Sequence, residues 1–331
     1  MATAREPRLR LGVVGLGRLW EARYKPALAR MPGRARVVAV YDQVARRATV
    51  EAASIRCAAV DGLTALIDRP DLDALLVLTP QWFGLHPVAL AAERGTPVFC
   101  ALPVAGDPAG LEALAPSIRA GGGAFVPELA RRAYPASVRL KELLATKLGP
   151  PRLILGHVRL GGFDRYGPPG PSSQSVPSTL LQDPGGNVVD WCRWVFGSEA
   201  TTAQGIGCTA IGGEVPGRDF ESIALGFEGG GLAKVDIALH HRAAWGEPQR
   251  LPPTPGFAVY TERGSAWLEM PDALRWADAE GPREERLTLE PSLGEVLIEQ
   301  FLRRVRGEPS DAPGLDDALA AARLVSRLRG G

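Results

Sequence analysis

Short apolar runs alternate with stretches of helix-forming composition along the first 126 residues. The apolar runs have the continuous character of strands buried on both faces of a sheet; they are Leu9–Gly17 with its glycine turn, Val37–Tyr41, Ala74–Leu78, Pro97–Cys100 and Ala124–Val126. The helical stretches are Trp20–Met31, Val44–Ala53, Asp61–Ile67, His86–Arg94 and Pro108–Ala120. Regular alternation of strands and helices predicts an α/β fold with a doubly wound parallel sheet.

The pattern changes after about residue 127. A helix is predicted over Ser137–Leu148 and a strand over Arg152–Leu160, and Gly161–Ser178 is so rich in Gly, Pro and Ser that it predicts a long loop, a candidate lid. After a helix over Leu180–Phe196, the strands follow one another closely, which favours antiparallel pairing; they are Thr201–Ile211, Ser222–Phe227, Leu232–Leu239, Phe257–Thr261 and Ala266–Met270. Two helices, Leu293–Val305 and Leu315–Leu328, close the chain.

Chain length and composition fit two globular domains. The chain has 331 residues, more than a single core usually supports. Its 45% hydrophobic and 23% charged residues are ordinary for globular proteins. We therefore expect an α/β domain over residues 1–126 and an α+β domain with a largely antiparallel sheet over residues 127–331.

Charge, hydropathy and cysteine content exclude several kinds of partner. With 38 Lys+Arg against 37 Asp+Glu, the chain has no net field that would attract nucleic acid or an anionic membrane. No apolar stretch reaches the roughly 18 residues of a membrane-spanning helix, and the amino terminus lacks a signal-peptide core, so we expect a cytoplasmic protein. The 4 cysteines lie far apart, which predicts free thiols and no metal site.

The main candidate site is the glycine turn after the first strand. The residues that stand against the G-x-G-x-x-G fingerprint are Gly15, Leu16, Gly17, Arg18, Leu19 and Trp20. In that fingerprint, glycines and the first helix amides approach the pyrophosphate of a dinucleotide. Asp42 ends the second strand, where a carboxylate accepts hydrogen bonds from the adenosine ribose, and this favours NAD over NADP. The plain alternatives are a tight strand-to-helix turn and, for Asp42, a helix N-cap.

Trp20 is the departure from this fingerprint, because the third position normally packs a small residue between helix and strand. Two hypotheses are open for its side chain. The indole fills the space that the pyrophosphate needs and impairs cofactor binding, or it points away into the core, as buried aromatic side chains usually do.

The order of motifs along nearly the whole chain resembles the Gfo/Idh/MocA family of nicotinamide-dependent oxidoreductases. The matching segments are Gly15–Gly17, Tyr41–Asp42, Asp73–Ala74, Leu78–Pro80, Gly95–Pro103, Arg132–Pro135, Asp183–Gly197, Thr261–Gly264 and the two closing helices. The resemblance implies a Rossmann-like dinucleotide-binding domain and a second domain that binds substrate and forms oligomers. The cofactor-binding residues that it implies are Gly15, Gly17, Arg18, Leu19, Asp42, Thr79, Pro80, Gln81, Ala101, Leu102 and Pro103.

The residues that usually perform this family's chemistry are replaced in this chain. Where the family typically carries Glu-Lys-Pro, the chain has Ala101, Leu102 and Pro103, and the histidine of Asp-x-Gly-x-His is Asn187. Neither a leucine nor an asparagine amide exchanges a proton near neutral pH. A third motif, Thr-Pro-Asn-x-x-His, reads Thr79 to Gly84 and lacks its histidine as well.

Other side chains remain as candidates for catalysis and substrate binding. Asp183 is the acid that the family keeps beside substrate hydroxyls, although a helix N-cap is an equal alternative. His157 lies on the first strand of the second domain, where a core or surface role is the plainer reading. Asn187 and Asp183 are expected to bind a polar substrate, with Trp82 stacking on a sugar ring or the nicotinamide. Asp190 is expected on a solvated or ion-paired helix face.

Three functions fit these observations. The resemblance implies hydride transfer between NAD(P) and a sugar, polyol or similar polar carbonyl or alcohol, with a degenerate acid-base set. The alternative is a catalytically inactive regulatory protein that binds a dinucleotide or a sugar on the same scaffold. The third is an assembly role for the second sheet, whose apolar outer face predicts a homo-oligomer, either a dimer or a tetramer.

Overall fold

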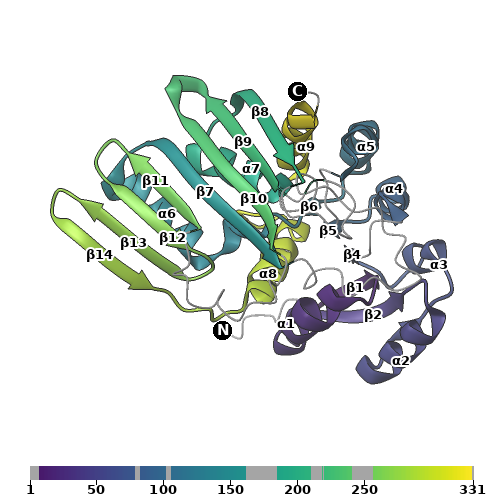
Figure 1. Ribbon diagram of the computed structural model, residues 1–331. Coiled ribbons are helices and arrows are strands. Elements are labelled where there is room, and N and C mark those ends of the chain that lie inside the picture. Colours follow the sequence, from purple (N-terminus) through teal and green to yellow (C-terminus); the bar gives the residue numbers. More distant parts are fainter. Residues whose placement is uncertain are drawn as a thin grey trace. The chain divides into compact units, whose positions relative to one another are not determined.

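The computed structural model describes residues 7–78, 83–101, 106–161, 185–209, 218, 220–240 and 256–329. It divides into two compact units (Figure 1). The first unit contains residues 1–128 and 290–319, and the second contains residues 129–289 and 320–331. The sequence indicates a boundary near residue 126 but not this return of the chain, because an amphipathic pattern predicts a helix without saying which sheet the helix covers.

The first unit is built on a parallel six-stranded sheet with the order β3-β2-β1-β4-β5-β6. This order is that of dinucleotide-binding doubly wound folds. The strands are β1 (Leu9–Val14), β2 (Ala35–Tyr41), β3 (Ala58–Ala59), β4 (Ala74–Val77), β5 (Val98–Cys100) and β6 (Phe125–Pro127). All residues of β4, β5 and β6 are buried, as the continuous apolar runs predict.

Helices follow the strands as the sequence predicts, with boundaries within a few residues. They are the π-helix η1 (Trp20–Tyr24), which continues into α1 (Lys25–Arg30), and then α2 (Ala45–Ile55), α3 (Leu63–Ile67), α4 (His86–Glu93) and α5 (Pro108–Gly121). The predicted doubly wound fold is therefore confirmed.

The returning segment of the first unit contains α8 (Leu293–Val305) and the start of α9 (Leu315–Arg329). A capping box begins α8, since Ser292 N donates to Glu295 Oε2 at 2.9 Å. The Phe301 side chain is buried, with its ring 5.7 Å from that of Phe99 on β5. Ion pairs hold the polar side of the helix to the first unit, including Arg34 to Glu299 at 2.7 Å.

The second unit carries an eight-stranded sheet with the order β14-β13-β12-β11-β7-β10-β9-β8. Its strands are β7 (Pro151–Gly161), β8 (Ala200–Cys208), β9 (Phe220–Phe227), β10 (Leu232–His240), β11 (Phe257–Thr261), β12 (Ser265–Glu269), β13 (Ala273–Asp278) and β14 (Gly281–Arg286). Neighbours pair antiparallel except β7 and β10, which run parallel. The largely antiparallel α+β domain is thus confirmed.

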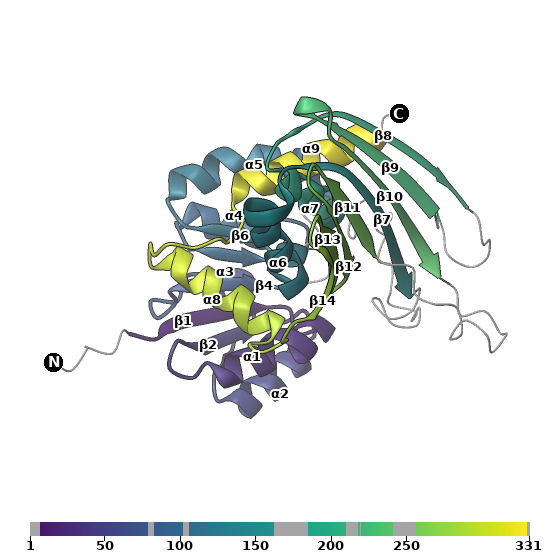
Figure 2. The same ribbon diagram turned by 90° about the vertical axis from the view of Figure 1, so that its left-hand side faces the viewer.

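The two faces of this sheet differ in what covers them. The helical elements of this unit are η4 (Ala130–Ala133), α6 (Pro135–Leu143), η5 (Leu144–Leu148), α7 (Gly186–Phe196), η7 (Glu228–Gly230) and the end of α9. Helices α6 and α7 lie on one face (Figure 2), where the Trp191 ring packs 4.5 Å from the Phe257 ring. On the other face Leu155, Leu232 and Tyr260 are 38%, 45% and 38% exposed, and within the described ranges no helix covers it.

Two strands of this unit, β13 and β14, were not predicted from the sequence, although β13 carries a short alternation in which Leu274 and Trp276 are buried and Arg275 is exposed. β14 is an edge strand whose residues are mostly exposed and include Arg283, Glu284, Glu285 and Arg286. Such a strand is held by main-chain pairing to its neighbour, so its side chains carry no apolar alternation. The predicted lid, Gly161–Ser178, lies outside the described residues except for Gly161 at the end of β7.

Candidate functional site

The carboxyl ends of the parallel strands lie in line across the first unit. Val14 pairs with both Tyr41 and Val77, Val77 pairs with Cys100, and Cys100 pairs with Pro127. The residues that follow these strand ends therefore share one edge of the sheet. Open α/β sheets bind their ligands beyond that edge.

The glycine turn follows β1 at this edge, and the space beside its main chain is open. Gly15 has φ +91°, a conformation that favours glycine, and its N–H donates to Tyr41 O at 2.9 Å. A Cβ placed on Gly17 would meet nothing within 4 Å, so the main chain there is open to a ligand. The helix begins at once, with Glu21 N donating to Gly17 O at 3.1 Å. Its first amides, those of Arg18 and Leu19, belong to the turn whose N–H groups have no partner within a helix.

Asp42 is tied to the glycine turn. Its Oδ2 accepts from Leu16 N at 2.8 Å and its Oδ1 accepts from Val44 N at 2.9 Å. Arg47 Nη1 lies 3.3 Å from Oδ1 and 3.4 Å from Oδ2. The bond from Val44 N, two residues on, closes an Asx-turn ahead of α2, whose N-cap is Val44. The bond from Leu16 N holds the glycine turn beside the end of β2. The N-cap interpretation of Asp42 is therefore wrong, because Val44 is the N-cap of α2, and the binding of a ribose by Asp42 stays a prediction.

Trp20 does not fill the space above the turn. Its side chain is 1% exposed, and Nε1 donates to Glu51 Oε1 on α2 at 3.1 Å. Glu51 Oε2 also accepts from Lys25 Nζ at 2.9 Å, and this hydrogen bond raises the pKa of Lys25. The indole is thus buried and anchored to α2, as the second hypothesis expects, and none of its atoms lies within 4 Å of a Cβ placed on Gly17.

The edge continues at Leu78 and Ala101, which directly follow β4 and β5. Leu78 N donates to Val14 O at 2.8 Å and Ala101 N donates to Val77 O at 2.9 Å, so the main chain here is fixed by the sheet. Ala101 brings only a methyl group to the edge. The other predicted residues of this region, Thr79, Pro80, Gln81, Trp82, Leu102 and Pro103, lie outside the described part of the chain, as does Asp183.

Asn187 lies in the first turn of α7 and is half-buried. The helix is fixed by Asp190, which is 1% exposed and accepts from Arg132 Nε at 2.7 Å and from Arg193 Nη1 at 3.2 Å. Trp191 adds a hydrogen bond from Nε1 to Ser137 Oγ at 2.9 Å. Of the two alternatives predicted for Asp190, the ion-paired one is confirmed and the solvated one is wrong, because the side chain is buried. These bonds fix the helix that carries Asn187.

His157 lies on the opposite face of the second sheet from α7. It neighbours Asp236 on β10, with Nδ1 3.6 Å from Asp236 Oδ2, and its side chain is 46% exposed. α7 packs on the other face, through the contact of Trp191 with Phe257. The structure therefore does not bring His157 and Asn187 together.

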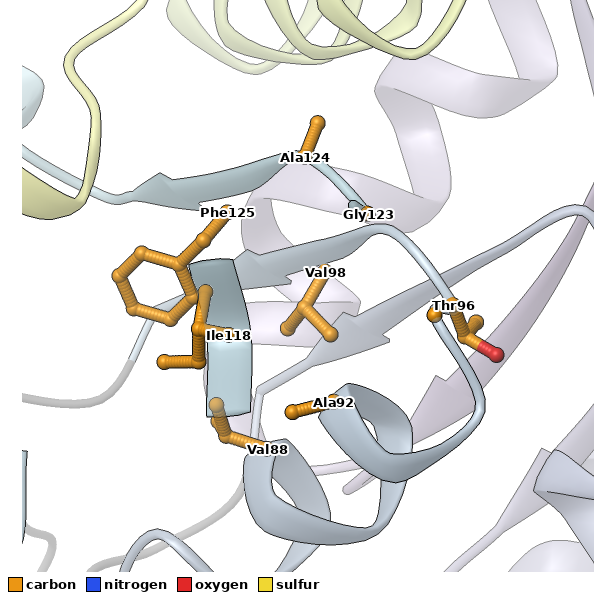
Figure 3. A pocket seen from close by; sticks show the side chains of 9 residues that line it. Val88, Ala92, Thr96, Val98, Ile118, Gly123, Ala124 and Phe125 are labelled. Atoms are coloured by element: carbon orange, nitrogen blue, oxygen red, sulfur yellow. The ribbon is translucent and has the colours of Figure 1, made fainter. Parts of the chain in front are cut away.

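A hollow at the other end of the first sheet does not mark the site. It lies at the amino ends of β5 and β6, between α4 and α5, and is lined by Val88, Val98, Ile118 and Phe125 among others (Figure 3). Its lining holds no charged side chain, and only about 10 Å³ is open to water, which is room for about one molecule.

Two further classes of site find no support in the part of the chain that the structure describes. It contains no group of three or more His, Cys, Asp or Glu side chains suited to a metal ion. None of its helices is long and apolar enough to cross a membrane.

Arg47 and Glu51 are contacts that the sequence did not single out. Both lie on α2, within about three turns of Asp42 along the chain. The sequence did offer a signal for Arg47, namely a basic residue shortly after Asp42 at the start of the next helix. The sequence offered no signal for Glu51, because spacing along the chain does not reveal which acid accepts the hydrogen bond of the Trp20 indole N–H.

Comparisons with known proteins agree with this geometry. Residues 9–126 match the oxidoreductase family with an NAD-binding Rossmann fold. A dTDP-3,4-didehydro-2,6-dideoxy-alpha-D-glucose 3-reductase of Streptomyces antibioticus is 39% identical over 116 residues, which are 35% of each chain. An inositol 2-dehydrogenase of Acidothermus cellulolyticus is 32% identical over 216 residues, 62% of this chain and 58% of that protein. The matched segments thus span well under two thirds of these relatives.

The fold is shared along the whole length. Levoglucosan dehydrogenase, solved as a complex with NADH and levoglucosan, superimposes with a TM-score of 0.83 at 19% identity, covering 98% of this chain and 97% of that one. The dinucleotide-binding part of the chain, residues 9–126, therefore matches the Gfo/Idh/MocA oxidoreductase family, and the two-unit fold is shared over nearly the whole chain.

Proposed function

We propose that the protein is an NAD(P)-dependent oxidoreductase that transfers hydride between the nicotinamide and a sugar- or polyol-like alcohol or carbonyl. The observation that carries this proposal is the open main chain at Gly17, set at the strand-end edge and followed directly by a helix. An NAD(P) cofactor would supply the hydride chemistry. Gly15, Gly17 and the amides of Arg18 and Leu19 would hold its pyrophosphate, and Asp42 its adenosine ribose.

The predicted contacts that follow β4 and β5 extend this site along the same edge. Thr79, Pro80 and Gln81 follow β4, and Ala101, Leu102 and Pro103 follow β5, so both segments are proposed to bound the cofactor. Trp82, Asp183 and Asn187 are proposed to bind substrate. Asp183 is the proposed proton-exchanging group, since a carboxylate is the ionisable side chain that remains in the replaced motif. His157 stays a weaker candidate because of its place on the exposed sheet face.

The second candidate function is a regulatory protein that binds a dinucleotide or a sugar without turnover. Leu102 and Asn187 favour it, because they stand where this family has a lysine and a histidine. Calorimetric titration with NAD, NADH, NADP and NADPH, and with glucose, myo-inositol and levoglucosan, tests binding, and assays with the same three sugars and polyols test turnover. Dinucleotide binding together with turnover supports the enzyme, and binding of a dinucleotide or a sugar without turnover supports the regulator. A protein that binds no ligand of either kind overturns both.

We also propose that the outer face of the second sheet forms a homo-oligomer, a dimer or a tetramer. Leu155, Leu232 and Tyr260 are exposed on this face, where Leu153 pairs with both Leu232 and Tyr260 and Leu155 pairs with Lys234 and Ala258. A large exposed apolar patch commonly marks an interface. Leu155→Lys should shift the protein to monomer in light scattering, while Val50→Lys, an exposed valine on α2 of the first unit, should not. A parent protein that is monomeric at micromolar concentration contradicts this proposal.

A further inference from the structure

We infer that Arg47 allows the adenosine end of this cofactor site to accept the 2′-phosphate of NADP(H) as well as the 2′-hydroxyl of NAD(H). The inference rests on the proposed dinucleotide binding and concerns which form of the cofactor is used. Asp42 alone indicates NAD, because a free carboxylate accepts from the ribose hydroxyls and repels a phosphate.

The Asp42 carboxylate is not free in this structure. Each of its oxygens accepts from one backbone amide, at 2.8 Å from Leu16 and 2.9 Å from Val44. Each also has the Nη1 of Arg47 within 3.3–3.4 Å. A carboxylate has about four acceptor positions. The two amide bonds and the two contacts to Arg47 therefore occupy all of them.

The group that this pair presents to solvent is the guanidinium. The side chain of Asp42 is 7% exposed and that of Arg47 is 50% exposed. In the described structure the hydrogen bonds of Arg47 involve Nη1, so Nε and Nη2 remain as donors. A planar guanidinium with paired donors matches the oxygens of a phosphate. Its positive charge also offsets the carboxylate that would otherwise repel a phosphate dianion.

The same arrangement still admits NAD(H). The contacts of Arg47 to Asp42 are long for hydrogen bonds, and a half-exposed ion pair of this kind contributes little. Arg47 can therefore turn away and leave Asp42 to the ribose hydroxyls. The amide from Leu16 is unaffected by this movement, so the glycine turn stays in place. Both cofactor forms are then accepted, and Arg47 decides the balance between them.

The test is calorimetric titration of the full chain with NADH, NADPH, 5′-AMP and 2′,5′-ADP. The two nucleotide fragments differ only in the 2′-phosphate, so their ratio isolates that contact. We expect the parent to bind NADPH within about tenfold of NADH. In Arg47→Ala, NADPH and 2′,5′-ADP should weaken about tenfold or more, the effect of losing a charge-assisted hydrogen bond. NADH and 5′-AMP should change less than about threefold.

Arg46→Ala is the matched control. Arg46 is the exposed neighbour on α2, its removal changes the net charge equally, and within the described structure it makes no hydrogen bond to Asp42. It should weaken all ligands slightly and leave the NADPH-to-NADH ratio unchanged. Arg47→Lys should keep part of the NADPH affinity, because it keeps the charge but loses the planar donor pair.

The outcomes separate this inference from the proposed function. A parent that binds NADH but not NADPH overturns the inference and leaves the proposed function standing. An Arg47→Ala variant with an unchanged NADPH-to-NADH ratio, or with the same ratio change as Arg46→Ala, also overturns it. A folded parent that binds none of the four ligands overturns both.

Discussion

The glycine turn of the first unit and the start of α7 in the second unit both depart from the expected motif, but with different consequences for the site. At the turn, the third fingerprint glycine has become Trp20, yet the indole bonds to Glu51 and the main chain at Gly17 stays open. At α7, the backbone scaffold is equally well held by Asp190, but Asn187 stands where a proton-exchanging histidine is expected. A bulky residue in the first region leaves the main chain beside it open, and a polar residue in the second provides no group that exchanges a proton near neutral pH.

The comparison shows that side-chain volume is a poor guide to which of these sites is impaired. A cofactor pocket made of main-chain amides tolerates any side chain that points away. A site for general acid-base chemistry depends on the pKa of one group, so a change of residue type abolishes it whatever the packing. We therefore expect the glycine turn to bind the dinucleotide and the start of α7 to limit the rate of proton transfer.

The largest expected effect tests whether Trp20 is a structural anchor. Trp20→Ala should lower the free energy of unfolding by about 3–5 kcal/mol, the usual result of removing a large buried ring. Trp20→Phe should cost about 1–2 kcal/mol, since it keeps most of the ring and loses the bond to Glu51. Urea denaturation measures both. Parent stability together with tighter NADH binding in Trp20→Ala would show that the indole does obstruct the cofactor.

The next effect concerns the space above the turn. Gly17→Val should weaken NADH binding roughly 100-fold, about 2.7 kcal/mol, by placing methyl groups where the pyrophosphate is proposed to lie. The fold should be unaffected, because a Cβ there meets nothing within 4 Å. Gly62→Val is the control, as Gly62 is equally open but precedes α3. Titration and thermal melting give the two readouts, and unchanged NADH affinity in Gly17→Val would remove the observation on which the proposed function rests.

The sequence predicts the frame of this site better than its contacts. Strand ends are predictable because buried parallel strands are continuous apolar runs, and the glycine turn and Asp42 follow from their place after those runs. The direction of the Trp20 side chain was not predictable. It depends on Glu51, 31 residues away along the chain, and on the widened π-helical turn that starts at Trp20.

The placement of His157 shows a similar limit. Strand alternation says that His157 and Val158 face opposite sides, but not which side α7 covers. That choice is made by the packing of Trp191 on Phe257, a contact between residues far apart in the sequence. Edge strand β14 was missed for the opposite reason, since its exposed polar residues carry no pattern at all.

A smaller effect is expected at the acid of the second region. Asp183→Ala should reduce the affinity for whichever compound of the glucose, myo-inositol and levoglucosan panel binds the parent by about 1.5–3 kcal/mol, the range for a hydrogen bond to a charged group. Trp82→Ala should weaken the same ligand by the loss of an apolar ring contact. Calorimetry in the presence of saturating cofactor measures both. If both variants bind like the parent, the substrate site lies elsewhere in the molecule.

The smallest effect is expected at Asn187, and it addresses the comparison most directly. Asn187→Ala should weaken the same ligand by only about 0.5–1.5 kcal/mol, because a neutral amide is lost rather than a charge. The helix should keep its place, since the bonds of Asp190 to Arg132 and Arg193 do not involve position 187. Asn187→His should leave affinity near that of the parent while restoring a group that titrates near pH 6.5. Turnover in Asn187→His that rises with pH through this range, and is absent from Asn187→Gln, would show that a proton-exchanging group is what this region lacks. Equal turnover in the parent and in both variants would show instead that the chemistry never depended on this position.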